Sequence, residues 1–373
     1  MNKFSLQNLY YQWWKNIDKF LFFLIILLFF IGLFFSLVST SLIVSDKLNT
    51  NDYSFFFKHL IFIILGIGII FSFSAINQEN LIKISLAIFF LSILFLFLVP
   101  FFGVEVKGSK RWIDLYLLPR FQPVELVKPF LIVFISIILS SERYSNIYFK
   151  YLLSFLITIM IVLLLALQPD IGQTLLILFT WSILIFMSGI NIIFLSILFL
   201  LLIFSLTYLI TFVPKFDYIK NRILSFFDKE TGTHNFQSDK AIESITSGGF
   251  FGKGIGEGTL KVDVPEAHTD YIISVISEEF GVIAIILILF LFLVFIYSIF
   301  KKVNFENDER TKLILVGCTS LILMQAMIHI GVNIRLFPTT GMTLPYISYG
   351  GSSIISVSII SGMILNLTKR KIN

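Results

Sequence analysis

The sequence predicts an all-α integral membrane protein, with about ten transmembrane helices in one bundle and a large extracytoplasmic loop between the seventh and eighth helices. The first observation behind this prediction is composition. Of the 373 residues, 57% are hydrophobic and only 14% are charged, and the mean hydropathy is +0.92. The second is that several apolar runs reach the roughly 20 residues that cross a bilayer. These values exclude an ordinary soluble protein.

Ten apolar runs define the predicted helices. The motifs "QPDIG" and "SGIN" separate the fifth, sixth and seventh runs, because proline and glycine beside polar residues mark tight turns. No internal repeat and no paired broken helices of the inverted-repeat transporter type are present. The first run is too long for a signal peptide and is expected to remain as the first span. The runs lie at about 20–40, 55–75, 81–101, 123–140, 150–167, 171–188, 190–212, 270–300, 311–333 and 346–368.

Lysine and arginine in the short connections predict the orientation. With ten spans, these residues gather at one end, which we expect to face the cytoplasm together with both termini. The opposite end then carries the large loop, residues 213–269. The basic residues are Lys3, Lys15, Lys19, Arg143, Lys150, Lys301, Lys302, Arg310, Lys312, Lys369, Arg370 and Lys371.

The segment "FFGVEVKGSKRWIDLYLLPRFQP" is basic although the prediction places it on the outer face. Two explanations are open: a solvated run of charges, or an anion site at the outer membrane face. The second would explain cations in a loop that works against the usual positive-inside distribution. The charged residues are Lys107, Lys110, Arg111 and Arg120, against Glu105 and Asp114.

The stretch "PEAHTDY" places an acid at the start of the eighth predicted helix. We expect Thr269 to cap this helix and Asp270 to lie in its first turn. A polar stripe follows on one helical face and is expected to line the bundle interior or a water-filled cleft, since a carboxylate inside a membrane costs about 2.5–3.5 kcal/mol. For Asp270 alone, a favourable charge at a positive helix end is the simpler reading. The stripe is Asp270, Ser274, Ser277, Glu278 and Gly281.

Glu125 and Lys128 in "QPVELVK" are three residues apart and therefore neighbours on one helical face. They either pair with each other, or Lys128 also serves as a point charge for phosphate. Asp170 in "QPDIGQ" stands at a predicted helix start, where capping is the expected role.

Two glycine-containing stretches lie on the outer face. "GFFGKGIGEG" is no dinucleotide fingerprint, because no βαβ unit surrounds it, and predicts a loop with close backbone approach. "SYGGSS" is expected to open the last helix, where its amides bind an anion or its small residues pack. Ser348 and Gly350 belong to it, and Arg335 is a further outward cation nearby.

Cysteine and histidine usage predicts no metal site. Cys318, the only cysteine, cannot form an intrachain disulfide and is expected to be a small buried residue. His329 lies in an apolar run, where a hydrogen-bonded core histidine is expected. His59, His234 and His268 show no metal-ligand spacing. No cofactor is implied, and a divalent cation at the outer site is left open.

The residues thus predict a site for an anionic amphiphile that enters partly from the membrane. They do not distinguish chemical conversion from transport. The same residues resemble a known family, the SEDS proteins (shape, elongation, division and sporulation). The matching stretches are "GSKRWIDL…QPVELVKP", "QPDIGQTLL", "GGFFGKGIGEGTLKVDVPEAHTDYIISVISEEFG" and "RLFPTTGMTLPYISYGGSSIIS", in the family's order and over nearly the whole chain. Val124 and Tyr271 depart from the commoner serine and phenylalanine.

The resemblance implies one polytopic domain over 1–373 that acts as a peptidoglycan glycosyltransferase in the bacterial cytoplasmic (inner) membrane. Its substrate would be lipid II. The residues around "GKGIGEGTLK" look more like the division branch of the family, which implies a role at the division septum. The implied partners are a class B penicillin-binding protein of the transpeptidase type and other division membrane proteins, with no nucleic acid. A lipid II flippase and an elongation-type polymerase are the alternatives.

By the family parallel, Asp270 is the catalytic residue and would act as a general base on a sugar hydroxyl. One tension follows, because a helix N-terminus stabilises the carboxylate anion while a base must bind a proton readily. Burial or Glu266 would offset it. The residues expected to bind the pyrophosphate are Lys110, Arg111, Lys128 and Arg335. The supporting residues are Glu125, Trp112, Glu266, Thr269, Glu278, Asp170, Ser348 and Gly350.

Overall fold

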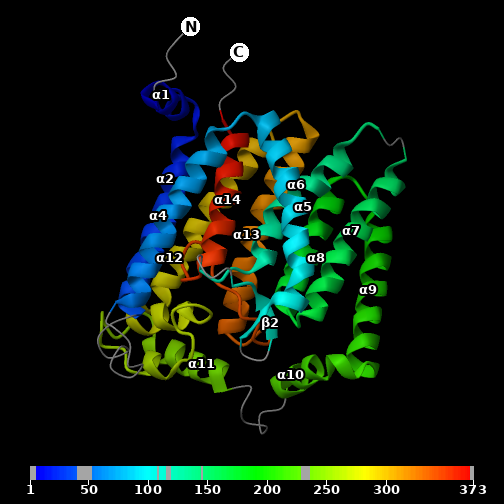
Figure 1. Cartoon of the computed structure of the whole chain (residues 1–373). Helices are drawn as coiled ribbons and strands as arrows, with labels where there is room; N and C mark the ends of the chain where they lie inside the picture. The colour runs from blue at the N-terminus through cyan, green and yellow to red at the C-terminus, as the bar shows by residue number, and fades with distance from the viewer. Residues whose placement is uncertain are drawn as a thin grey trace.

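The computed structural model describes residues 6–39, 53–106, 109–114, 119–143, 146–227 and 236–369, and shows one helical bundle (Figure 1). Each of the ten predicted apolar runs contains a helix. Eight of these helices are long and apolar enough to cross a membrane: α2 (Lys19–Ser39), α4 (Ser54–Ala75), α5 (Gln78–Phe102), α6 (Pro123–Ser140), α7 (Ile147–Leu167), α9 (Ile192–Phe212), α12 (Ile272–Val303) and α13 (Glu309–Asn333). Two shorter apolar helices are α8 (Ile171–Met187) and α14 (Gly351–Leu367). The chain is a multi-pass membrane protein.

The two chain termini lie at one end of the bundle, and the elements of the long connecting loops lie at the other (Figure 1). Figure 1 shows α1 (Leu6–Asn16), the start of α2 and the end of α14 at one end. The opposite end, called the loop end below, carries the elements of the connecting loops (Figure 1). These are β1 (Val104–Val106), β2 (Ser109–Trp112), η1 (Pro214–Phe216), α10 (Asp217–Phe227), α11 (Phe236–Gly248) and η2 (Leu260–Asp263). Lys3, Lys107, His234, Arg370 and Lys371 lie outside the described residues.

The hairpin of β1 and β2 is an addition to the all-α expectation. Its strands pair antiparallel, with Glu105 opposite Lys110. "VEV" and "SKRW" are too short to give a periodic signal, yet alternating valine with a charged residue suits a half-exposed strand.

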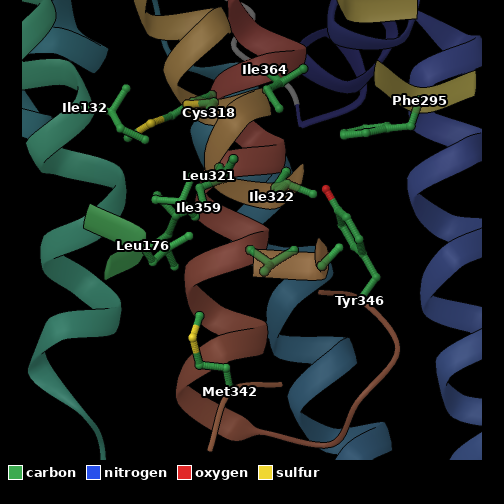
Figure 2. Close-up of a cluster of buried hydrophobic side chains, with 14 of the residues drawn as sticks. Ile132, Leu176, Phe295, Cys318, Leu321, Ile322, Met342, Tyr346, Ile359 and Ile364 are labelled. Carbon is green, nitrogen blue, oxygen red and sulfur yellow. The ribbon is translucent and has the colours of Figure 1, made fainter. Parts of the chain in front are cut away.

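The core lies where α13 meets its neighbours. Figure 2 shows side chains from α6, α8, α12, α13 and α14 converging there, Cys318 among them, together with Tyr346 from the segment before α14. Cys318 is fully buried, as expected. The Tyr346 hydroxyl lies 2.9 Å from the Ser361 hydroxyl, which satisfies both polar groups inside the core. By contrast, none of the residues in the apolar window of α9 whose burial is described is buried. The α9 side chains therefore need lipid around them.

The predicted close approach of the glycine-rich loop is confirmed where it meets α12. The helix breaks at Gly281, whose φ is 74°, and Gly252 in the loop has a φ of 79°. A Cβ on Gly252 would lie 2.1 Å from the Glu279 carbonyl oxygen, and one on Gly281 would lie 2.2 Å from that of Phe250. The Gly254 amide donates to the Glu279 carbonyl at 3.0 Å. The loop backbone thus satisfies a carbonyl that the helix break leaves without its usual partner.

Candidate functional site at the loop end of the bundle

Asp270 lies in a turn directly before α12. The helix begins at Ile272, with Tyr271 in the cap position and no side-chain cap bond, so the prediction that Thr269 caps the helix was wrong. The Glu266 carbonyl closes a separate turn instead, accepting from the amides of Thr269, Asp270 and Tyr271 at 3.0, 3.1 and 3.3 Å. The Thr269 hydroxyl donates to the Glu266 carboxylate at 3.1 Å. Asp270 therefore stands ahead of the helix rather than within its first turn.

Two other segments hold this turn. The side-chain amide nitrogen of Asn333, at the end of α13, donates to the Asp270 carbonyl at 3.0 Å. The Tyr349 amide, just before α14, donates to the His268 carbonyl at 3.1 Å. Gly341 lies close to the carboxylate, since a Cβ there would be 3.7 Å from Asp270 Oδ2. The half-buried Asp270 side chain thus lies where α12, α13 and the segment before α14 meet.

Glu125 and Lys128 form an ion pair in the first two turns of α6. Their Oε2 and Nζ atoms are 2.8 Å apart, and both residues are buried, with Lys128 only 1% exposed. Glu125 Oε1 also accepts from Gln173 Nε2 at 2.9 Å, and Lys128 Nζ donates to Gln325 Oε1 at 3.3 Å. The mutual pairing proposed from the sequence is therefore present, within a wider amide network. Such additional hydrogen bonds offset the cost of removing both charges from water.

Arg111 joins the hairpin to the turn between α7 and α8. Its Nε donates to the Gln168 carbonyl at 3.1 Å, and its guanidinium lies 3.8 Å from Asp170 Oδ1. Asp170 caps α8 as expected, accepting from the Gln173 amide at 3.5 Å. It also accepts from Gln122 Nε2 at 2.8 Å. Because Gln173 reaches Glu125 through its side chain, the Arg111 and Lys128 groups belong to one connected network.

A polar edge on α13 consists of Gln325, His329 and Asn333, each four residues after the last. Gln325 Nε2 donates to the Thr343 carbonyl at 3.0 Å, and His329 Nδ1 lies 2.7 Å from the Met342 carbonyl oxygen. The hydrogen-bonded core histidine expected at His329 is thus confirmed. Residues four apart lie on the same face of a helix, so Gln325 and His329 both face segment 341–343.

This polar edge connects the two parts of the site. Gln325 contacts Lys128 at one end, and Asn333 contacts Asp270 eight residues further along. At 1.5 Å per residue, the two contacts are about 12 Å apart along α13. Sequence reasoning missed Gln325, Asn333 and Gln173. The four-residue spacing of polar side chains in an apolar helix was the available signal for the first two.

Glu278 contacts the glycine-rich loop and does not belong to the Asp270 turn. It is fully buried and accepts from Lys253 Nζ at 3.1 Å and from the amides of Leu260 and Lys261 at 2.9 and 2.6 Å. Of the two surroundings expected for the polar stripe, the structure shows the packed interior for Glu278. Glu278 therefore holds the glycine-rich loop against α12.

The remaining predicted residues are dispersed around the loop end. Arg335 forms an ion pair with Asp239 of α11, and Lys110 is exposed on the hairpin. Trp112, in β2, is half-buried. A cavity shared by Asp270, Glu125 and the four cations stays a prediction.

The last helix begins at Gly351, about five residues later than expected, with Gly350 before it. Ser348 forms a turn first, because its amide donates to the Leu344 carbonyl at 3.0 Å and its hydroxyl accepts from the Leu344 amide at 2.9 Å. A Cβ on Gly351 would lie 2.5 Å from the Phe62 ring, so close packing requires glycine there.

The comparisons with known proteins agree with this arrangement. Residues 18–373 match the FtsW/RodA/SpoVE family, described as cell cycle protein. The chain belongs to this family. Among FtsW/RodA/SpoVE relatives, a protein of Caulobacter vibrioides named "probable peptidoglycan glycosyltransferase FtsW" is 32% identical over 364 residues, covering 96% of this chain and 91% of its own length. A Haemophilus influenzae protein of the same name is 30% identical, covering 94% and 90%.

Solved structures of FtsW/RodA/SpoVE proteins share the fold. A chain from a peptidoglycan synthase complex aligns with a TM-score of 0.78 at 26% identity, covering 94% of this chain and 97% of its own. The rod shape determining protein RodA of Thermus thermophilus aligns with a TM-score of 0.69 at 25% identity, covering 94% and 96%. These likenesses extend over nearly the whole bundle, including the helices that position Asp270.

Proposed function

We propose that this chain polymerises lipid II into glycan strands at the division septum, with Asp270 as the general base. The observation that carries the proposal is the placement of Asp270 at the loop end, where three segments converge and one of them presents Gly341 to the carboxylate. Family membership and relatives named as probable peptidoglycan glycosyltransferases assign the chain to this enzyme class.

The reaction requires one displacement. Asp270 takes the proton from a sugar hydroxyl of one lipid II molecule, and the resulting oxygen attacks the anomeric carbon of the other strand's lipid-linked sugar. The bond between that carbon and the pyrophosphate oxygen breaks, and the electron pair leaves with undecaprenyl pyrophosphate. Inversion at carbon follows, and no covalent enzyme intermediate is needed.

The leaving pyrophosphate needs positive charge rather than a proton. Lys110, Arg111, Lys128 and Arg335 are the proposed sources. Lys110 is exposed and can reach a phosphate directly. Lys128 is buried by Glu125 and Gln325, so it reaches a phosphate only when this network opens toward the loop end.

The proposed setting is the cytoplasmic (inner) membrane, with both termini cytoplasmic and the loop end outside. The basic residues at the end opposite the loops support this orientation. The proposed partner is a class B penicillin-binding protein, and the likeness to a chain from a peptidoglycan synthase complex supports it.

The test is polymerisation of purified lipid II by the full chain with its transpeptidase partner. We expect Asp270→Asn to lower the polymer yield at least 100-fold, because a neutral amide cannot accept the proton. Asp263→Asn is the matched control, since it alters an exposed acid in the same loop. Wild-type yield from folded Asp270→Asn protein would refute the base assignment. Lipid II crossing of liposomes without any polymer from the wild type would favour the flippase alternative.

A further inference from the structure

The end of α13 holds Asp270 through a side chain that no substrate can touch. We propose that Asn333 is a positioning residue for Asp270: it fixes the turn from which the carboxylate projects. The inference rests on the proposed function. Asn333 is fully buried, and its Nδ2 donates to the Asp270 carbonyl at 3.0 Å and to the His329 carbonyl at 2.8 Å. Both hydrogens of the amide are therefore used to join the turn to the helix.

The chemistry of these contacts allows one orientation of the amide. Both partners are carbonyl oxygens, which only accept, so the amide nitrogen must face them. The opposite orientation would place Asn333 Oδ1 against two acceptors. The contact therefore specifies the position of the Asp270 backbone relative to α13, instead of merely filling space.

The same helix also fixes the other side of the carboxylate. His329, one turn before Asn333, lies 2.7 Å from the Met342 carbonyl oxygen through Nδ1. Because a carbonyl only accepts, Nδ1 carries the proton and donates. Gly341 precedes Met342 and lies beside the Asp270 carboxylate. Two neighbouring side chains of α13 thus hold the Asp270 turn and the facing backbone against one rigid helix.

The expected effect follows from how steeply a proton transfer depends on position. A misplacement of about 1 Å costs on the order of 100-fold in rate. We therefore expect Asn333→Ala to lower kcat about 10- to 100-fold. KM should stay within about twofold of wild type, because the fully buried Asn333 side chain is not accessible to substrate.

Asn366 provides a matched control. It is fully buried in α14, and its Nδ2 donates to the carbonyls of Phe73 and Ile76 at 2.8 and 2.6 Å. It lies in the last turn of α14, and this helix ends at the end of the bundle opposite the loop end (Figure 1). Asn366→Ala thus removes a buried amide with the same kind of partners and lowers stability without touching the proposed site.

The experiment measures Tm and the kinetics of lipid II polymerisation for the full chain with its transpeptidase partner, below the lowest Tm of the set. Both alanine variants should lower Tm, and only Asn333→Ala should lower kcat. Equal kcat values for the two variants would overturn the inference. If Asn333→Ala does not fold, Asn333→Ser keeps one donor, and its kcat should then fall below that of Asn366→Ser. Absence of polymer from the wild type would instead refute the proposed function.

Discussion

At the scale of single residues, glutamine side chains contact three buried charges near the starts of α6 and α8. A buried ion pair stabilises a protein only when further hydrogen bonds satisfy both partners, because desolvation of the two charges is costly. Each charged group here has such a partner within 3.3 Å. The contacts are Gln173 to Glu125, Gln325 to Lys128 and Gln122 to Asp170.

The pair of Glu125 and Lys128 allows structure and activity to be separated. Each single change, Glu125→Gln or Lys128→Gln, should cost about 3–5 kcal/mol, because it leaves one buried charge without its counterion. The double variant should recover much of this stability yet remain inactive, if Lys128 also serves the pyrophosphate. The measurement is a double-mutant cycle on Tm and, separately, on polymerisation rate. Recovery of both in the double variant would reduce the pair to a structural role.

At the scale of elements, long apolar runs predicted the helices well and their ends less well. The ten runs matched because about 20 apolar residues have few alternatives to a helix in a membrane. The starts of α12 and α14 were misplaced because the turns closed by the carbonyls of Glu266 and Leu344 precede them. Those turns use backbone contacts that residue types at a helix start do not reveal.

The polar edge of α13 shows what the sequence could not supply. The residues of this edge are visible in the sequence as a four-residue spacing, which predicts a shared face. The hydrogen-bond partners of these residues cannot be identified from the sequence, because segment 341–343 packs beside α13 only after the chain has turned back at the loop end. Asp270 and Lys128 could thus be singled out from the sequence, but the contacts through which α13 connects them could not.

Helix α13 also offers a test at its other end, where Asp308 caps it. Its carboxylate accepts from the Thr311 amide at 3.1 Å and the Thr311 hydroxyl at 2.6 Å. Burial alone would raise the pKa of Asp308, but these hydrogen bonds outweigh it and hold the pKa below the ordinary 3.8. The stabilisation is therefore present above the unfolded-state pKa and is lost as pH falls through the lower folded-state value.

We expect Asp308→Ala to cost about 1 kcal/mol at neutral pH. The difference in Tm between wild type and variant should shrink below about pH 4, where the unfolded-state carboxyl binds its proton. Thermal unfolding from pH 3 to 7 measures this. A difference that grows on acidification would contradict the assigned direction.

At the scale of the whole molecule, two acid–base pairs attach the 213–269 loop to α12. Lys253 Nζ lies 3.1 Å from Glu278, and Lys261, which is buried, pairs with Glu279. Because α12 follows directly on the Asp270 turn, the same helix contacts the loop and adjoins the proposed base. A partner that binds the loop would therefore act on the helix that carries the site.

Breaking one of these pairs should loosen the loop. Glu279→Ala leaves the Lys261 charge buried without its counterion, and we expect a loss of about 3–5 kcal/mol. Cleavage of the glycine-rich stretch by added protease should become faster. Glu243→Ala is the control, because it removes an exposed pair with Lys240 and should leave Tm and cleavage near wild type. Equal cleavage of both variants would show that the buried pair does not hold the loop.

The order of these four residues also bears on how the chain is made. Lys253 and Lys261 precede Glu278 and Glu279, so translation delivers the cations before the acids. When α12 leaves the ribosome, the residues that neutralise its carboxylates have already been synthesised. With the order reversed, a nascent apolar helix would enter the bilayer with two unpaired carboxylates, at about 2.5–3.5 kcal/mol each on insertion scales. We expect these pairs to form as α12 inserts, so that the helix avoids this cost.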